Sequence, residues 1–230
     1  MLAFSSLLGN VEGQNIYRIW YDKPASYWEE ALPVGNGRIA AMVFGDPQLE
    51  QIQLNEETVS AGSPYQNYNE EAKTALPEMR RLIFEGKYEE AQNMAATKIL
   101  SQVGNEMPYQ TVGRLNIRYQ DHKKVNNYYR DLDISNAVAV TRYEVDGVEF
   151  TEETFASFTD QLVIRHIKSS KPGAINCELF FNTPMRDPKR SIYGKKGLRL
   201  EGITYGSRYF PGKVHYCADL DVKHKGGKVI

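Results

Sequence analysis

The chain has 230 residues, of which 41% are hydrophobic and 25% are charged, and 28 basic against 29 acidic residues leave a formal net charge of -1. These values are ordinary for a globular protein of one large domain or two small ones. A nearly neutral charge gives no electrostatic reason to expect a nucleic acid partner. No apolar run approaches the roughly 18 residues of a membrane-spanning helix, so we expect no membrane span.

Residues 1–9 are similar to the end of the apolar region of a signal peptide followed by small residues, although they lack its basic start. We expect residues 1–15 to be a signal-peptide remnant or a disordered terminus. The mature protein is then expected outside the cytoplasm, in the periplasm or secreted. Residues 16–230 are expected to form one domain, and because 226–230 read as a turn that enters a new strand, we expect that domain to be truncated at its C-terminal end.

A G-x-G-x-x-A string begins at Gly35, and a carboxylate follows about twenty residues later, as in dinucleotide-binding proteins. That site requires a strand before the glycines and a helix after them. Pro33 lies just before the glycines, where a central strand would need a backbone donor. Only residues 38–44 separate the glycines from the next turn, whereas a parallel crossover requires a dozen residues or more. The string therefore predicts a turn that leads into a buried strand over 39–44, and a second turn at 45–47 leads to the strand 49–54.

One segment has the periodicity of helices. Between Asn69 and Gln102, apolar residues recur every three or four positions, at 76, 79, 82 and 83 and then at 88, 91, 95 and 99. Pro77 fits the first turn of a helix, and Gly86 fits the end of one helix before a second begins. The pattern predicts a pair of short helices near 69–102, inserted between strands.

Most of the remaining chain predicts strands. Two alternating runs, 138–145 and 148–155, flank Asp146-Gly147, which is a strong hairpin signal. Further strands are predicted at 115–119, 161–167, 175–181 and 214–222. Regular short strands with turn residues between them indicate a mainly β protein, an antiparallel β-sandwich.

The two cysteines lie on strands with opposite phases. Cys177 shares the apolar face of its strand, whereas Cys217 alternates with His215 and Asp219 on the polar face. Opposite faces disfavour a disulfide bond, so we expect two free thiols.

The sequence predicts no metal site and no cofactor. Four histidines show no ligand spacing, and the cysteines are too far apart for a zinc motif: His122, His166, His215 and His224. His166 alternates with Leu162 and Ile164, which predicts a packed core histidine. Adjacent carboxylates such as Glu152 and Glu153 point to opposite faces of a strand, so most such pairs are expected to be solvated and not to form an acid–base pair.

Five stretches, in order, carry a resemblance to a known family. The stretch WEEALPVGNGRIAAMVFG resembles the N-terminal signature of glycoside hydrolase family 95, the α-L-fucosidases. The others resemble further blocks of the same family in the same order. The five stretches are 28–45, 52–58, 109–115, 129–133 and 155–161.

The resemblance implies a multidomain enzyme in which catalysis belongs to another domain. Family members look like an N-terminal β-sandwich of the super-sandwich type, a helical linker, a catalytic (α/α)6 barrel and a C-terminal β-domain. The implied reaction is hydrolysis of terminal α-L-fucosyl linkages, commonly α-1,2, with inversion, although some relatives favour α-L-galactosides. The catalytic residues belong to the barrel, so none is assigned here. The implied partners are the barrel of the same polypeptide and a fucosylated glycan, the substrate of the whole enzyme.

The implied role of the present chain is that of an accessory domain, which packs on the barrel and lends a loop to the rim of its active site. Five residues are predicted to contact the substrate or the barrel: Trp28, Asn36, Arg38, Asn55 and Glu56. The alternative is that Trp28 belongs to the core, that Asn36 is a turn residue with positive φ, and that the other three are ordinary loop residues.

Two rival interpretations remain. The first is a stand-alone carbohydrate-binding sandwich, in which exposed tyrosines stack on sugar rings: Tyr65, Tyr68, Tyr128, Tyr129, Tyr205 and Tyr209. The second is a structural scaffold that exposes a barrel-facing apolar patch when isolated and therefore associates.

Overall fold

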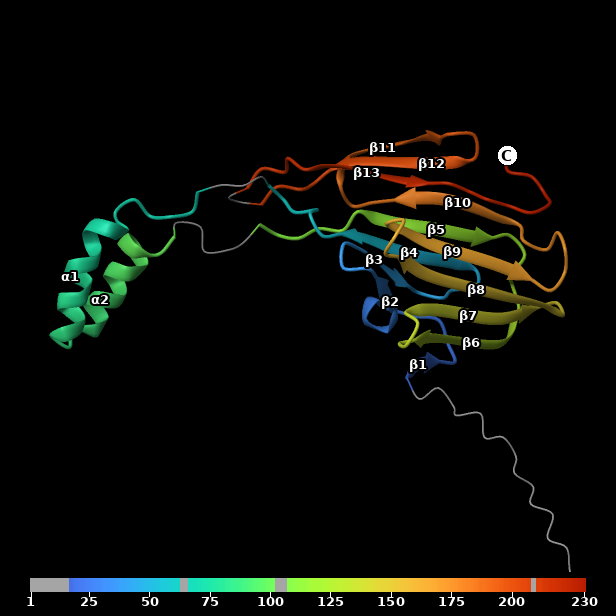
Figure 1. Ribbon diagram of the computed structural model, residues 1–230, viewed down its shortest axis with the longest axis horizontal. Helices are drawn as coiled ribbons and strands as arrows, with labels where there is room; N and C mark the ends of the chain where they lie inside the picture. The colour runs from blue at the N-terminus through green and yellow to red at the C-terminus, as the bar shows by residue number, and fades with distance from the viewer. Residues whose placement is uncertain (1–16, 63–65, 102–106, 208–209) are drawn as a thin grey trace, which may run out of the picture.

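The structure is a computed structural model that describes residues 17–62, 66–101, 107–207 and 210–230 (Figure 1). Residues 1–15, which are predicted to be a signal-peptide remnant or a disordered terminus, lie outside the described residues. Antiparallel pairing joins thirteen strands of the described residues into three sheets. The strands are β1 (Arg18–Tyr21), β2 (Leu32–Gly35), β3 (Ile39–Val43), β4 (Leu49–Glu56), β5 (Gly113–Tyr119), β6 (Val125–Asp133), β7 (Val138–Val145), β8 (Val148–Ser157), β9 (Leu162–Ser169), β10 (Cys177–Asn182), β11 (Arg186–Tyr193), β12 (Gly197–Ile203) and β13 (His215–Leu220).

Two five-stranded sheets lie face to face and form the sandwich that the sequence predicts (Figure 1). The first sheet has the order β1-β6-β7-β8-β9, and the second has the order β10-β5-β4-β3-β2. The third sheet, β11-β12-β13, lies beyond β10. The mainly β, antiparallel fold class is therefore confirmed.

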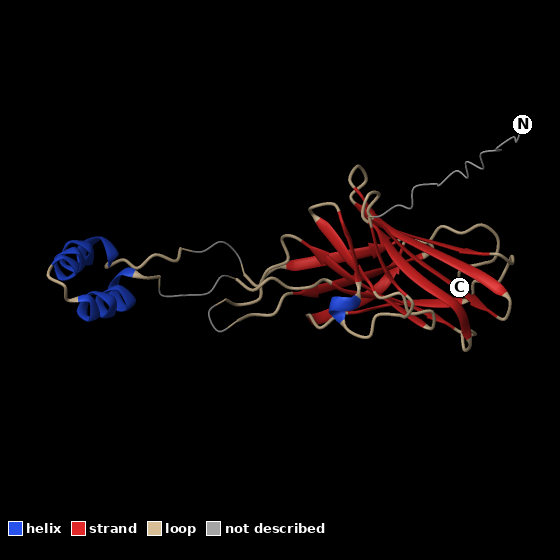
Figure 2. Ribbon diagram, turned by 90° about the horizontal axis from the view of Figure 1, so that it is seen from below, coloured by secondary structure: helices blue, strands red, loops and turns tan. Residues whose placement is uncertain are grey.

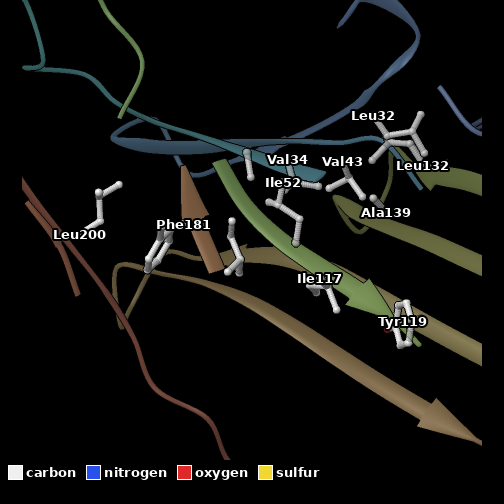
Figure 3. Packing of buried hydrophobic residues seen from close by; sticks show 12 residues of the cluster. Leu32, Val34, Val43, Ile52, Ile117, Tyr119, Leu132, Ala139, Phe181 and Leu200 are labelled. Carbon is white, nitrogen blue, oxygen red and sulfur yellow. The ribbon is translucent and has the colours of Figure 1, made fainter. Parts of the chain in front are cut away.

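The core lies between the first two sheets, where every second residue of a strand points inward. Leu32, Ile52 and Ile117 from the second sheet contact the same buried cluster as Leu132 and Ala139 from the first (Figure 3). Burial of each large apolar side chain contributes roughly 1.5–3 kcal/mol. The predicted turn at Gly35 connects β2 to β3 in this core layer, so the nucleotide interpretation fails on topology as well as on length.

A helical pair, α1 (Ala72–Phe84) and α2 (Tyr88–Met94), extends from the sandwich, and a π-helical turn, η2 (Ala95–Ile99), continues the second helix (Figure 2). The predicted pair near 69–102 is confirmed. Gly86 follows the C-cap residue Glu85 of α1 and adopts a φ of 75°, which is the conformation expected of a glycine that ends a helix.

The predicted position of Pro77 in the first helical turn is wrong. The helix begins earlier, at Ala72, after a turn in which Oδ1 of Asn69 accepts a hydrogen bond from the backbone N–H of Glu71 at 3.1 Å and the carbonyl of Asn69 accepts one from Ala72. Pro77 therefore lies inside α1. The helix tolerates the loss of one backbone donor there.

The predicted core position of His166 is also wrong. On β9 the inward residues are Val163, Arg165 and Ile167, while His166 is exposed and lies 3.3 Å from a carboxylate oxygen of Glu153. Leu162 and Ile164, with which His166 alternates, lie on the outer face of the strand together with His166. The cysteines behave as predicted: Cys177 is half-buried, Cys217 is exposed, and both are free.

A buried ionic cluster explains why an arginine points inward on β9. Glu50 of β4 and Glu152 of β8 both bind the guanidinium of Arg165, and the Glu50 contact measures 2.7 Å from Oε2 to Nη2. Tyr119 and Tyr143 donate hydrogen bonds to Oε1 of Glu152 at 2.7 and 2.6 Å. Glu152 is therefore an exception to the expectation that adjacent carboxylates are solvated.

The cluster joins the two sheets at an electrostatic cost. Two carboxylates and one guanidinium leave an excess of negative charge in the interior. Burial raises the pKa of Glu50 to about 7, against the opposing attraction of Arg165. Because this folded-state pKa exceeds the ordinary value of 4.5, the stabilisation linked to a neutral Glu50 is complete at low pH and is lost as the pH rises through about 7.

We predict that Arg165→Met lowers the free energy of unfolding by about 3–5 kcal/mol at pH 8, because it leaves two buried carboxylates unpaired. The loss of unfolding free energy is smaller at pH 5, because Glu50, whose pKa is raised to about 7, is protonated there. Urea denaturation at both pH values measures the effect. The matched control is Arg199→Met, which breaks a partly exposed pair with Asp219. Equal losses in the two variants at pH 8 would contradict the role of the cluster.

Candidate functional site

Two turns at one end of the sandwich are joined by a single buried side chain. Asn36 follows β2, is only 8% exposed, and donates a hydrogen bond from Nδ2 to the carbonyl of Ser157 at 2.7 Å. A longer contact of 3.3 Å reaches Oε1 of Gln161. Its Oδ1 accepts hydrogen bonds from the backbone N–H groups of Arg38 and Ile39. Asn36 thus fixes the β2–β3 turn against the β8–β9 turn.

The alternative in which Asn36 is a turn residue with positive φ is wrong. The residue with positive φ is Gly37, at 91°, and not Asn36. Glycine adopts this conformation without the steric cost of a Cβ atom. Asn36 is therefore free to use its amide as a bridge between two turns.

Arg38 and Glu56 form the exposed part of the site. The Nε atom of Arg38 lies 3.2 Å from Oε1 of Glu56, at the end of β4. The other carboxylate oxygen of Glu56 accepts hydrogen bonds from the backbone N–H and the hydroxyl of Thr58. Partial burial alone would raise the pKa of Glu56, but the hydrogen bonds from Thr58 and the pairing with Arg38 outweigh it and lower the pKa. Glu56 is thus an ionised acceptor at neutral pH.

Tyr109 lies close to these groups. Partial burial raises the pKa of its phenol, and the carboxylates of Glu56 and Glu57 raise it further. Tyr109 pairs with Ser60 in an isolated β-bridge, which fixes its segment beside the end of β4. We call Asn36, Arg38, Glu56, Tyr109 and Gln161 the turn cluster.

Trp28 and Asn55 lie away from the turn cluster. Trp28 is 47% exposed in a 3-10 turn, η1 (Trp28–Glu30), which precedes the start of β2, whereas Asn36 follows its end. It is therefore not a core residue. Asn55 lies on the face of β4 opposite to Glu56, where its Oδ1 is buried without a hydrogen-bond partner among the described residues.

The outer face of the second sheet, which Asn55 shares with Gln53, is hollowed beside β5. Gln53 pairs in register with Arg114, whose guanidinium lies 5.5 Å from the centre of the Phe44 ring and hydrogen-bonds to Gln51. The lining of this shallow hollow is polar: Gln53, Thr111, Gly113, Arg114, Asn182, Thr183 and Pro184.

The chemistry available at the turn cluster is hydrogen bonding. It offers a guanidinium, an ionised carboxylate, an amide and a phenol, which together suit a hydroxyl-rich ligand. It does not offer a protonated carboxyl, because the pKa of Glu56 is lowered. In the part of the chain that the structure describes, no group of three or more histidine, cysteine, aspartate or glutamate side chains is arranged to hold a metal ion.

Comparison with known proteins identifies the family of the chain. The sequence model described as "Glycosyl hydrolase family 65, N-terminal domain" matches residues 19–230. The chain belongs to this family of N-terminal domains. No helix within the described ranges is long and apolar enough to cross a membrane.

The chain is also similar to two proteins that are named as α-fucosidases. The chain is 36% identical over 181 residues to "Alpha-L-fucosidase 2" of Arabidopsis thaliana, a match that covers 76% of this chain and 21% of the relative. It is 27% identical over 198 residues to "Probable alpha-fucosidase A" of Aspergillus niger, covering 81% of this chain and 24% of the relative. The chain thus spans about a fifth to a quarter of the length of these relatives. The predicted relationship to the N-terminal part of α-fucosidases is confirmed.

Of the five predicted contact residues, the fold brings three together: Asn36, Arg38 and Glu56. Sequence reasoning did not single out Tyr109 or Gln161 as site residues. A signal for both was present, because four of the five family-like stretches meet here: 28–45, 52–58, 109–115 and 155–161.

We predict that Asn36→Asp destabilises the domain by about 1–3 kcal/mol, because a carboxylate cannot donate to the Ser157 carbonyl and leaves it unpaired. Thermal or urea denaturation measures the loss. Asn93→Asp is the matched control, since Asn93 is an exposed helical residue of α2. An Asn36→Asp variant as stable as Asn93→Asp would contradict the bridging role.

Proposed function

We propose that this chain is the N-terminal accessory domain of an inverting α-L-fucosidase of glycoside hydrolase family 95. The whole enzyme hydrolyses terminal α-L-fucosyl linkages of glycans, chiefly α-1,2, and this domain packs on an (α/α)6 catalytic barrel of the same polypeptide. The observation that carries the proposal is the match of nearly the whole chain to a glycosyl hydrolase N-terminal domain, together with relatives named as α-fucosidases of whose length the match covers only 21–24%.

Three carboxylates, Glu50, Glu152 and Glu56, support an accessory role. Inverting glycosidases use two carboxyl groups about 6.5–9.5 Å apart, with room between them for a water molecule and the sugar. Glu50 and Glu152 lie together, but both are buried and share the guanidinium of Arg165. A glycan has no access to them. Glu56 is accessible, but its pKa is lowered, which does not suit a general acid.

Within the proposed enzyme, the turn cluster is the part that contacts the barrel or the rim of its active site. Arg38 has a 60% exposed side chain, so it is available to a second surface, while Asn36 holds its turn in place. Asn55 and Trp28 remain in the proposal as contacts on other faces. An extracytoplasmic location is part of the same proposal.

A stand-alone carbohydrate-binding sandwich is the second candidate. Its support is the exposure of aromatic residues: Tyr68 is 66% exposed and Tyr205 is 48% exposed. Tyr129 stacks on the exposed Trp20 with ring centres 6.3 Å apart. Tyr128 does not fit, because it is half-buried and its hydroxyl binds the carbonyl of Gly45. The two remaining tyrosines, Tyr65 and Tyr209, lie outside the described residues.

We predict that the 230-residue chain releases no fucose from 2′-fucosyllactose, whereas a polypeptide extended through the proposed barrel does. Fucose release, followed by chromatography, measures both. Turnover by the 230-residue chain would overturn the accessory role. Glycan-array binding by the 230-residue chain, with no activity in the extended polypeptide, would favour the second candidate.

We further predict that Arg38→Ala in the extended enzyme raises KM by roughly three- to tenfold, the size expected for one hydrogen bond to a ligand. Steady-state kinetics on 2′-fucosyllactose measures the change. The control is Arg199→Ala, because Arg199 is also exposed and ion-paired but lies in the third sheet. Two results together would refute a position of Arg38 at the rim of the active site. The kinetic parameters of the two variants would be equal, and Arg38 would lie far from the sugar and the barrel in a structure of the extended enzyme with fucose.

A further inference from the structure

The charges of the chain are segregated along the sequence. Residues 186–228, which contain the third sheet and the segment after it, hold 11 basic and 4 acidic residues, whereas residues 1–185 hold 17 basic and 25 acidic residues. The two parts therefore carry formal charges of +7 and -8, which the net charge of -1 conceals. The third sheet lies at one side of the molecule (Figure 1). A local field of one sign raises the concentration of ions of the opposite sign, so this side attracts anions.

The few carboxylates of the basic part are mostly neutralised within it. Three of the four form ion pairs with basic residues of the same segment: Asp187 with Arg186, Asp219 with Arg199, and Asp221 with Lys223. Lys195, Lys225 and Lys228 form no ion pair with a carboxylate of the described residues. The segment thus keeps an excess of positive charge after its own ion pairs are formed.

Part of this excess charge borders a hollow. The turn between β11 and β12 and the segment that follows β13 form an open hollow of about 440 Å³. Such a volume lies within the roughly 300–1,000 Å³ of small-ligand sites. Three ammonium groups, one imidazole and one carboxylate line this space, which we call the basic hollow: Lys195, Lys196, Lys223, His224 and Asp221, with Val222.

Two side-chain contacts hold the walls of the basic hollow in place. Nζ of Lys196 donates a hydrogen bond to Nε2 of His224 at 2.5 Å, which ties the β11–β12 turn to the segment after β13. Nδ1 of His224 donates in turn to the carbonyl of Gly226 at 2.6 Å. Nζ of Lys223 lies 2.6 Å from Oδ2 of Asp221. Lys195 has no such contact, so its ammonium group is available to a ligand.

The lining of the basic hollow favours an acidic ligand over a neutral one. Three ammonium groups face one carboxylate, so their mutual repulsion exceeds what Asp221 compensates. An anion in the hollow relieves that repulsion, whereas a neutral molecule does not. Lysine binds sulfate, phosphate and carboxylate groups as a compact point charge, with three donors for their oxygens.

A nucleic acid is the rival anionic partner, and the lining does not favour it. Proteins bind single-stranded nucleic acids with aromatic side chains or arginines that stack on the bases. The lining of the basic hollow contains no arginine and no phenyl, phenol or indole ring. A long duplex would also approach the rest of the chain, whose formal charge of -8 repels it. A single acidic group on a carbohydrate needs only the hollow itself.

We propose that the basic hollow is a binding site for an acidic sugar, which is a sugar residue that carries a sulfate ester or a carboxylate. The acidic group accepts hydrogen bonds from Lys195 and from the neighbouring ammonium groups of Lys196 and Lys223. The choice of a carbohydrate as the carrier of the acidic group rests on the proposed function, because the substrate of the proposed enzyme is a glycan. The third sheet thereby holds an acidic polysaccharide on the enzyme.

Binding of polysaccharides to the 230-residue chain tests the proposal. Dextran sulfate supplies sulfate esters, polygalacturonate supplies carboxylates, and unmodified dextran is the neutral control. Isothermal titration calorimetry at about 50 mM salt, where screening is weak, is expected to give at least one acidic polymer an affinity roughly tenfold or more above that of dextran. The acidic polymer that binds more tightly identifies the acidic group. Equal affinities for all three polymers would overturn the proposal.

Two double variants distinguish a site from diffuse attraction. Lys195→Gln/Lys196→Gln is expected to weaken binding of the acidic polymer roughly three- to tenfold, because it removes two exposed ammonium groups from the hollow. The matched control, Lys123→Gln/Lys124→Gln, removes two adjacent exposed lysines between β5 and β6 and leaves binding unchanged. Equal weakening in the two variants would refute the site. If the first variant loses thermal stability, Lys195→Gln takes its place, since it keeps the contact between Lys196 and His224.

Two further measurements define the partner and the context. Binding of a DNA duplex as tightly as the better acidic polysaccharide would overturn the proposal in favour of a nucleic acid. The polypeptide extended through the proposed barrel is expected to bind the same acidic polymer, and loss of binding there would refute a role in the whole enzyme. Fucose release is not the readout, so an extended polypeptide that binds the polymer but releases no fucose contradicts the proposed activity and not this site.

Discussion

One guanidinium shared by two carboxylates connects the two sheets of this sandwich from within. Arg165 and Glu152 come from the first sheet and Glu50 from the second, so the contact ties layers that otherwise meet through apolar side chains. A buried ionic cluster is costly unless each member is paired. Here the hydroxyls of Tyr119 and Tyr143 and two backbone N–H groups satisfy the remaining carboxylate oxygens. The relative position of β4, β8 and β9 is thus constrained, and with it the position of the turns that follow these strands.

The turn cluster depends on that constraint. Asn36 reaches from the β2–β3 turn to the β8–β9 turn, and this bridge is possible only while the two sheets keep their separation and offset. The result is a rigid polar surface made from segments that are far apart in the sequence. Such a surface is suited to contact a second body, and the chemistry of its groups favours hydrogen bonding over proton transfer.

Periodicity predicted the helical pair, the Asp146-Gly147 hairpin and most strands, because the residues of those elements alternate between core and solvent in the usual way. It was less informative where buried positions are polar. Alternation along β6 is obscured by Arg130 and Asp131, which are both fully buried, and this strand was not predicted. The same difficulty misplaced His166: leucine and isoleucine occupy the outer face of β9, while a compensated arginine occupies the inner face. A pattern of apolar residues cannot reveal a charge that is neutralised by partners on other strands.

The sequence by itself determined the mainly β class, the inserted helices, the free thiols and the family likeness, because each follows from local spacing or from contiguous stretches. It also determined that Gly35-Asn36-Gly37 is a turn, since the space before the next turn is too short for a crossover helix. Only the tertiary structure decided that Asn36, Arg38 and Glu56 lie together while Trp28 and Asn55 do not. It alone decided that Glu152 is buried. Those properties depend on which strands become neighbours, and strand order is set by long-range packing of inward faces that no single segment encodes.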